Sequence, residues 1–182
     1  MTMSITQSIT RPQKKDDAQK PLRVCFVCTG NTCRSPMAEA VANTLAQNEL
    51  SSLPQAVRPL AMPRLEAFSA GLMARDGEPI AENAVLALES TDIPAIDGHD
   101  YHGHKAHTLT AEEAESYDLL IGLTREHAMG MILRFPHLAK KITVLPCDIA
   151  DPYGGSLTVY QTCLQQIKEG VSALLFSGDQ QA

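Results

Sequence analysis

The sequence predicts a single α/β domain built on a four-stranded parallel sheet with helices on both faces. Apolar segments typical of buried strands alternate with segments of helical periodicity, which is the pattern of successive β-α-β units. The chain has 182 residues, a length that suits one domain. Its apolar fraction of 44% is sufficient to build the core of such a domain.

Each predicted strand is a short apolar run. The first run, LRVCFVC at 22–28, is continuous and rich in β-branched residues, which favours a strand buried on both faces. Three later runs indicate the other strands, although less cleanly: RLEAFSAG at 64–71, DLLIGLT at 118–124 and KITVLP at 141–146.

The predicted helices lie between and after these strands. Ser35 suits an N-cap and Pro36 suits the first helical position, so we expect a helix with one apolar face to begin there. Apolar residues spaced by three and four from Leu157 to Leu174 predict a long amphipathic helix near the C-terminus. Shorter helices are expected at 81–88, 111–117 and 125–134.

Three segments fall outside this alternation. Residues 1–21 are polar, show neither strand nor helix periodicity, and are expected to form a disordered leader. Residues 49–63 contain three prolines and are expected to form a long connection whose role the sequence leaves open. With a C-terminal tail expected at 177–182, the predicted domain spans 22–176.

Composition and charge exclude several classes of protein. Fifteen basic residues against 21 acidic ones give a net charge of −6, which argues against a nucleic-acid partner. No apolar stretch approaches the ~18 residues that a membrane span needs, and no apolar core of a secretory signal is present. We therefore expect a cytoplasmic protein with no membrane partner and with reduced cysteines. The sequence leaves the oligomeric state open.

The loop after the first strand, CTGNTCRSP at 28–36, carries a candidate anion site. Gly30 and Asn31 tolerate left-handed backbone conformations, so the loop can curl with its N–H groups pointing inward. The helix that follows adds its positive end, and Arg34 can bind an anion with a bidentate fork. The Cys28 thiol at this positive concavity is expected to ionise readily and to attack a phosphorus atom held there.

These residues carry a family resemblance. CTGNTCRSPMAEA at 28–40 resembles the phosphate-binding signature of the low molecular weight protein tyrosine phosphatases, and the similarity extends over about residues 22–176. Further segments resemble other family motifs, namely FSAG at 68–71, GHKAHTLT at 103–110 and DPYGGS at 151–156. The resemblance implies a cysteine-dependent phosphatase that acts on phosphorylated proteins through a phosphocysteine intermediate, without a metal or other cofactor.

The resemblance also implies roles for single residues. Cys28 would be the nucleophile, Arg34 would stabilise the transition state, and Asp151 would act as general acid and then as general base. Ser35 would donate a hydrogen bond to the thiolate, and Asn31 would hold the shape of the loop. The remaining expected loop residues are Thr29, Gly30, Thr32 and Cys33, with Ser69 and His104 supporting Asn31.

Thr32 bears on the class of substrate. Tyrosine-directed members usually have an aliphatic residue at this position, whereas the bacterial protein arginine phosphatase branch has Thr within CTGNTCRS. A hydroxyl beside the scissile P–N bond can bind a guanidinium group or orient the attacking water. DPYGGS also resembles that branch, and Tyr153 can line the entrance for either substrate. The motifs favour phosphoarginine, with phosphotyrosine as the alternative.

Two other functions fit this sequence less well. Arsenate reductases of this fold need two more cysteines near the middle of the chain, and residues 91–127 contain none. A non-catalytic phosphate-binding or redox-sensing module is expected to lack at least one of Cys28, Arg34 and Asp151, and all three are present. Both functions are therefore less favoured.

The other cysteines have simpler expected roles. Cys25 lies within the first strand and is expected to be a buried core thiol rather than half of a zinc site. Cys147 and Cys163 are expected to be packing residues. The family resemblance suggests a reversible disulfide between Cys28 and Cys33, which the sequence leaves open.

Overall fold

The computed structural model describes residues 20–52 and 65–176. It contains one sheet with the strand order β2-β1-β3-β4, and every pair of neighbouring strands is parallel. The strands are β1 (Leu22–Cys28), β2 (Leu65–Gly71), β3 (Leu119–Gly122) and β4 (Ile142–Val144). The predicted four-stranded parallel sheet is confirmed. The predicted leader, apart from its last two residues, and the predicted tail lie outside the described residues.

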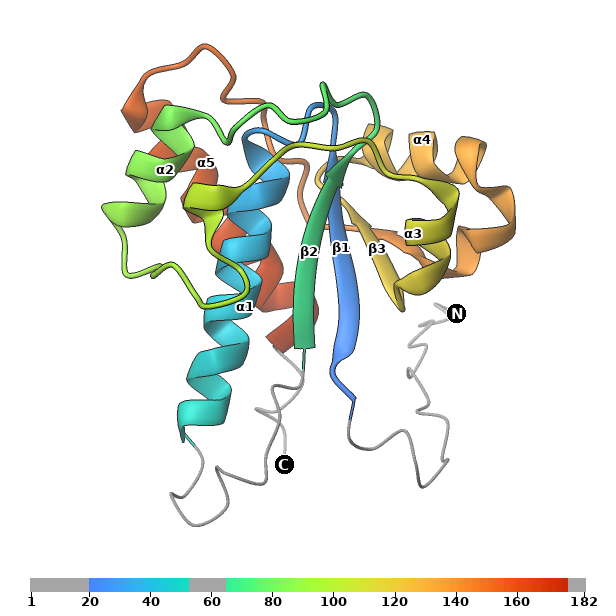
Figure 1. Cartoon of the computed structure of the whole chain (residues 1–182), viewed down its shortest axis with the longest axis horizontal. Coiled ribbons are helices and arrows are strands. Elements are labelled where there is room, and N and C mark those ends of the chain that lie inside the picture. The colour runs from blue at the N-terminus through green and yellow to red at the C-terminus, as the bar shows by residue number, and fades with distance from the viewer. Residues whose placement is uncertain (1–19, 53–64, 177–182) are drawn as a thin grey trace, which may run out of the picture.

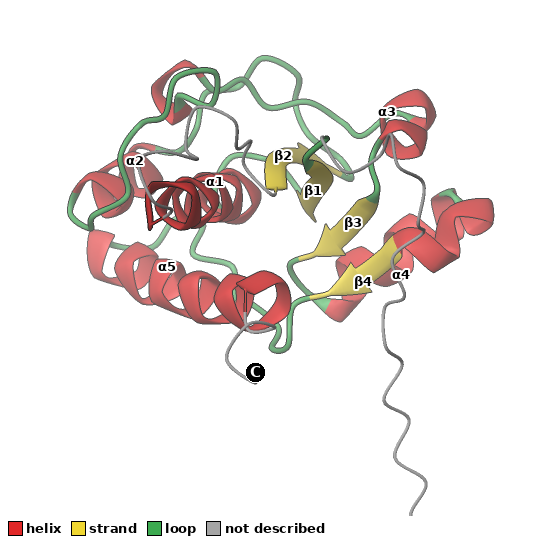
Figure 2. Ribbon diagram, turned by 90° about the horizontal axis from the view of Figure 1, so that it is seen from below, coloured by secondary structure: helices red, strands yellow, loops and turns green. Residues whose placement is uncertain are grey.

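Helices cover both faces of the sheet, as predicted (Figure 1, Figure 2). On one side lie α1 (Arg34–Ser52), α2 (Glu82–Glu89) and α5 (Leu157–Val171), and on the other lie α3 (Ala111–Ser116) and α4 (Arg125–Arg134). Two 3-10 turns, η3 (Tyr101–Gly103) and η4 (Pro136–Lys141), complete the connections. None of the helices in the described ranges is both long and apolar enough to cross a membrane.

The position of β1 inside the sheet explains its continuous apolar run. Successive side chains of a strand point to opposite faces, so a strand covered on both faces needs apolar residues at every position. Val24 and Phe26 pack in the core cluster that includes α1 and α5 residues, whereas Cys25 and Val27 pack in the cluster that includes α3 and α4 residues. All four side chains are fully buried.

The start and the burial of α1 differ from the prediction. The helix begins at Arg34, so Ser35 lies within its first turn rather than at its N-cap. Pro36 is tolerated there because the first N–H groups of a helix have no intrahelical acceptor. The expected single apolar face is wrong: buried residues occupy all sides of the helix as far as Ala46, because β2 packs on one side and α2 and α5 pack on another.

The ends of the two long helices also differ from the prediction. α1 continues to Ser52, so the connection expected from residue 49 is still helical there, and its later part lies outside the described residues. The C-terminal helix was expected to run unchanged to Leu174. Instead α5 ends at Val171 and a π-helical turn, η5 (Ser172–Phe176), follows it.

Gly122 allows α4 to approach the end of β3 closely. A Cβ at this position would lie 2.7 Å from the Ala128 nitrogen and 2.8 Å from the Thr124 oxygen, both of which are backbone atoms. Because neither atom can move without the helix, Gly122→Ala is expected to lower the free energy of unfolding in urea by about 1–3 kcal/mol. Gly103→Ala is the control, since its Cβ would meet nothing within 4 Å. Equal stabilities of the two variants would contradict this close approach.

Candidate active site

The loop predicted to bind phosphate connects β1 to α1 at the carboxyl edge of the sheet, where parallel sheets bind ligands (Figure 1). Cys28, the last residue of β1, is buried. Its Sγ atom lies 3.0 Å from the Ser35 Oγ atom and accepts a hydrogen bond from the Asn31 N–H at 3.3 Å. The sulfur therefore has a hydroxyl within hydrogen-bonding distance and an N–H that donates to it.

The Ser35 hydroxyl has a choice of acceptors. Besides Cys28 Sγ, its Oγ atom lies 3.3 Å from the carbonyl oxygen of Ala70. A hydroxyl has one proton, so it can donate fully to only one of them. A thiolate is the stronger acceptor because it is charged. Negative charge on Cys28 therefore favours donation from Ser35 to sulfur.

Asn31 organises the loop from within. It has a φ of 56° and is 0% exposed. Its Nδ2 donates to Ser35 Oγ and to Ser69 Oγ, each at 3.0 Å, and its Oδ1 accepts from the His107 N–H at 3.1 Å. Its carbonyl oxygen lies 2.8 Å from His104 Nε2, which must donate because a carbonyl can only accept. The two residues expected to support Asn31 both contact it.

Gly30, which was expected to tolerate a left-handed conformation, does not adopt one. Among the described residues, left-handed φ values occur at Asn31 and at glycines outside the loop. A Cβ on Gly30 would meet only Thr32 Oγ1, at an ordinary contact distance of 3.7 Å. The left-handed residue of the loop is therefore Asn31, whose side chain stabilises the turn that its own backbone makes.

The hydrogen bonds continue from Asn31 toward the surface. Ser69 Oγ donates to Glu39 Oε2 at 2.6 Å, and Glu39 Oε1 lies 3.5 Å from His99 Nδ1. The hydrogen bond to Glu39 is the largest cause of a raised pKa at His99. Sequence analysis did not identify Glu39 or His99 as part of this network, because nothing in the sequence shows that they meet Ser69.

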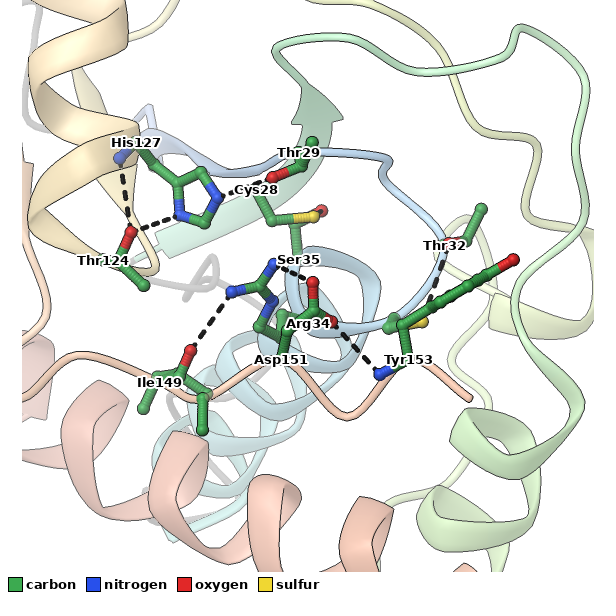
Figure 3. Close-up of polar contacts among 12 residues, drawn as sticks. Cys28, Thr29, Thr32, Arg34, Ser35, Thr124, His127, Ile149, Asp151 and Tyr153 are labelled. Carbon is green, nitrogen blue, oxygen red and sulfur yellow. Dashed lines mark hydrogen bonds and ion pairs between the residues drawn. The ribbon is translucent and has the colours of Figure 1, made fainter. Parts of the chain in front are cut away.

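Two of the three guanidinium nitrogens of Arg34 are hydrogen-bonded, and the third has no partner among the described residues. It is 6% exposed, its Nη1 donates to the Ile149 carbonyl at 3.2 Å, and its Nη2 donates to Asp151 Oδ2 at 2.7 Å (Figure 3). Its Nε is buried and has no hydrogen-bond partner among the described residues. A buried N–H is costly to leave unpaired, so this atom is a ready donor to an anion.

Asp151 meets Arg34 although the two residues lie 117 positions apart in the chain. Its side chain is 53% exposed, and its Oδ1 accepts from the Tyr153 N–H at 3.2 Å. The nearby Asp148 instead accepts from the Arg125 N–H at 2.8 Å. Of the two carboxylates, Asp151 is the one that contacts Arg34 directly.

Thr32 and Tyr153 lie on the same side of the loop in the view of Figure 3. Thr32 is half-buried, and its Oγ1 lies 3.6 Å from Cys33 Sγ, a weak hydrogen-bond partner. The Tyr153 side chain is exposed. The Thr32 hydroxyl therefore retains hydrogen-bonding capacity for a bound ligand.

All five cysteines are free thiols. Cys25 is fully buried, as predicted, and burial raises its pKa well above the ordinary value. Burial also raises the pKa of Cys33, and the disulfide expected between Cys28 and Cys33 stays a prediction. Cys163 is buried, but the expectation that Cys147 is a packing residue is wrong, because its side chain is exposed in the segment after β4.

His127, in the first turn of α4, was missed by the sequence analysis. Its Nε2 lies 3.1 Å from Thr29 Oγ1, and its Nδ1 lies 2.9 Å from Oγ1 of Thr124, the N-cap of the helix (Figure 3). It is 6% exposed, and burial followed by the charge of Arg34 lowers its pKa to about 4. The sequence does hold a signal that could have identified His127: Thr124 stands at the predicted helix start, and a histidine follows three residues later.

His127 is expected to make the folded protein less stable in acid. Its pKa is about 4 when folded and about 6.5 in an unfolded chain. Between these values the unfolded chain binds a proton that the folded protein does not, so stability falls as the pH drops from about 6.5 toward 4, by on the order of 3 kcal/mol in full. Urea unfolding at pH 7 and pH 5 should show a larger loss for the wild type than for His127→Gln. Equal losses would contradict this assignment.

Comparison with known proteins agrees with the geometry of the loop around Cys28. Residues 23–181 match the family model described as low molecular weight phosphotyrosine protein phosphatase. The protein-arginine-phosphatase of Bacillus subtilis is 33% identical over 153 residues, which cover 80% of this chain and 89% of that protein. A probable low molecular weight protein-tyrosine-phosphatase, EpsP of Ralstonia nicotianae, is 32% identical over 156 residues, which cover 82% and 91%.

Solved structures show the same fold. The YwlE arginine phosphatase from Geobacillus stearothermophilus matches with a TM-score of 0.67 and 30% identity, covering 85% of this chain and 90% of its own. A low molecular weight protein tyrosine phosphatase from T. tengcongensis matches with a TM-score of 0.68 and 33% identity, covering 84% and 97%. Sequence, fold and loop geometry agree: the chain belongs to the low molecular weight phosphotyrosine protein phosphatase family and is a phosphatase.

Proposed function

We propose that this phosphatase hydrolyses phosphoarginine in proteins, with Cys28 as the nucleophile. The observation that supports the catalytic part most directly is the buried, unpaired Nε of Arg34. Figure 3 shows Cys28 and Asp151 near the Arg34 guanidinium at the same loop. An anion that binds this donor would therefore lie near both the proposed nucleophile and the proposed acid.

In the first step, the Cys28 thiolate attacks phosphorus and an S–P bond forms as the P–N bond to arginine breaks. Arg34 Nε and the N–H groups of the loop bind the non-bridging oxygens, whose charge they stabilise in the transition state. Asp151, as the carboxylic acid, transfers its proton to the departing guanidine nitrogen. The products of this step are arginine and phosphocysteine.

Before a substrate binds, Arg34 and Asp151 form an ion pair. With no anion bound, Asp151 Oδ2 occupies the Nη2 donor at 2.7 Å. A phosphoryl oxygen carries more charge and can replace the carboxylate oxygen at that donor. Asp151, which is half exposed, is then released from Arg34 and takes up a proton from solvent, which makes it the carboxylic acid that the leaving group needs. Binding of the phosphoryl group thus delivers the acid.

In the second step, water attacks the phosphocysteine and Asp151 accepts its proton. The S–P bond breaks, inorganic phosphate leaves, and the thiolate is regenerated with the Ser35 hydroxyl 3.0 Å away to stabilise it. A relative supports a phosphorylated enzyme: in a solved YwlE arginine phosphatase with cysteine replaced by serine, the active-site serine is phosphorylated.

The preference for phosphoarginine rests on Thr32. Its half-buried hydroxyl has only a weak contact to sulfur and can hydrogen-bond a guanidinium group. Two curated relatives at 33% and 30% identity are named as arginine phosphatases. Tyrosine phosphatases occur at similar identity, so phosphotyrosine is the alternative. The cytoplasmic location stays a prediction.

The substrate class can be tested with matched phosphoarginine and phosphotyrosine peptides. We expect kcat/KM to favour phosphoarginine by about tenfold or more, which corresponds to roughly 1.4 kcal/mol of transition-state binding. Cys28→Ser serves as the blank. A preference for phosphotyrosine would assign the alternative substrate with the same mechanism, whereas turnover that persists in Cys28→Ser would refute the nucleophile.

Thr32→Ile is expected to shift the ratio of the two kcat/KM values toward phosphotyrosine by about tenfold. The change removes the hydroxyl that can bind the guanidinium, an interaction of about 0.5–1.5 kcal/mol. Thr162→Ile, at an exposed position of α5, controls for the general effect of the substitution. If Thr32→Ile leaves the ratio where Thr162→Ile leaves it, Thr32 does not determine the substrate.

Asp151→Asn is expected to lower kcat by about 10²–10⁴-fold on phosphoarginine peptides, because a general acid is lost. On p-nitrophenyl phosphate the first step should be much less affected, because its leaving group needs no proton, so Asp151→Asn should release a burst of p-nitrophenol before the slowed second step. Asp148→Asn keeps an oxygen acceptor for the Arg125 N–H and is the matched control. Equal effects of the two substitutions would argue against Asp151 as the acid.

A further inference from the structure

We propose that His127 is a positioning residue that holds Thr29, and through it the phosphate loop, in the geometry needed for phosphoryl transfer. The proposal rests on the chain being a phosphatase, but it does not depend on which phosphorylated residue is the substrate.

Thr29, the residue after Cys28, is hydrogen-bonded to two other parts of the fold. Its carbonyl oxygen accepts a hydrogen bond from the Met73 N–H at 2.9 Å, which fixes its backbone to the segment after β2. Its side-chain Oγ1 lies 3.1 Å from His127 Nε2, which fixes its side chain to α4. Asn31 and its partners hold the loop at a later position, so His127 is a second and separate support for the loop.

His127 is itself fixed in place. Thr124 Oγ1 accepts a hydrogen bond from the His127 backbone N–H at 3.3 Å and also lies 2.9 Å from the ring Nδ1. A rotation of the ring would break its contacts to Thr124 and Thr29 together. Gly122 lets the first turn of α4 approach the end of β3, which brings this ring to the loop. The His127 ring is therefore fixed relative to the sheet and can hold Thr29 in place.

The role of His127 is orientation rather than charge. Burial and the nearby Arg34 charge lower its pKa to about 4, against the opposing effect of Asp151 and Asp148. At neutral pH the ring is uncharged, so it does not compete with Arg34 for a phosphoryl group. Each ring nitrogen of a neutral imidazole either donates or accepts, and each here has a hydroxyl partner. The contribution to test is the hydrogen bond at Nε2.

Two amide substitutions separate the two ring contacts. The terminal amide of Gln reaches about as far as Nε2, so His127→Gln can still bind Thr29, whereas the amide of Asn reaches only about as far as Nδ1. With p-nitrophenyl phosphate, we expect His127→Asn to lower kcat about tenfold with little change in KM, and His127→Gln to keep most of kcat. His137→Asn, at an exposed position, is the control and should change neither constant.

Thr29→Val tests the same contact from the loop, since it removes the hydroxyl and keeps the shape. It should lower kcat as His127→Asn does, and the double variant Thr29→Val/His127→Asn should be no slower than either single variant, because both remove one interaction. Urea unfolding and the burst of p-nitrophenol measure the folded and active fractions. This separates a positioning effect, which lowers kcat per active site, from a loss of active protein.

Three results would overturn the proposal: a folded His127→Asn as fast as the wild type, a His127→Gln as slow as His127→Asn, or losses that multiply in the double variant. If His127→Asn does not fold, Thr29→Val decides alone: a kcat equal to that of the wild type would overturn the proposal. Failure of the phosphatase assignment is distinguishable, because the wild type would then show no turnover that depends on Cys28.

Discussion

The candidate active site depends on one buried side chain, Asn31. Its left-handed backbone turns the loop, and its amide group satisfies the hydroxyls and N–H groups that the turn brings together. Such a conformation is uncommon outside glycine and persists where the surroundings fix it. Because the Asn31 N–H also donates to Cys28 Sγ, the residue that shapes the loop also contacts the proposed nucleophile. Loop geometry and thiol chemistry are therefore linked.

Near Asn31, the donors of Arg34 are arranged so that an incoming anion can bind them. Arg34 is buried, yet it keeps one unpaired donor and shares another with a half-exposed carboxylate. An arginine with all of its N–H groups hydrogen-bonded within the protein would stabilise the fold but would have no free donor for an incoming anion. The arrangement leaves part of the hydrogen-bonding capacity of Arg34 for the phosphoryl group, which under our proposal also displaces the acid.

Local patterns predicted much of this structure. The run at 22–28 matches β1 because a strand covered on both faces needs an unbroken apolar run, and 125–134 matches α4. The burial of α1 on all sides could not be predicted, since it depends on α2 and α5 packing around it. The contacts of Asp151 with Arg34 and of His127 with Thr29 join residues about a hundred positions apart, and periodicity carries no signal for such pairs.

The central claim is that Cys28 carries the phosphoryl group during turnover. The most direct measurement is an acid quench during turnover of a phosphorylated substrate, followed by mass spectrometry of the peptide that contains Cys28. Our account predicts one phosphoryl group on that cysteine, at a level that rises in Asp151→Asn with p-nitrophenyl phosphate, since the second step is then slowed while the first needs no acid. A phosphoryl group on a histidine, or turnover with Cys28 unmodified throughout, would contradict the account.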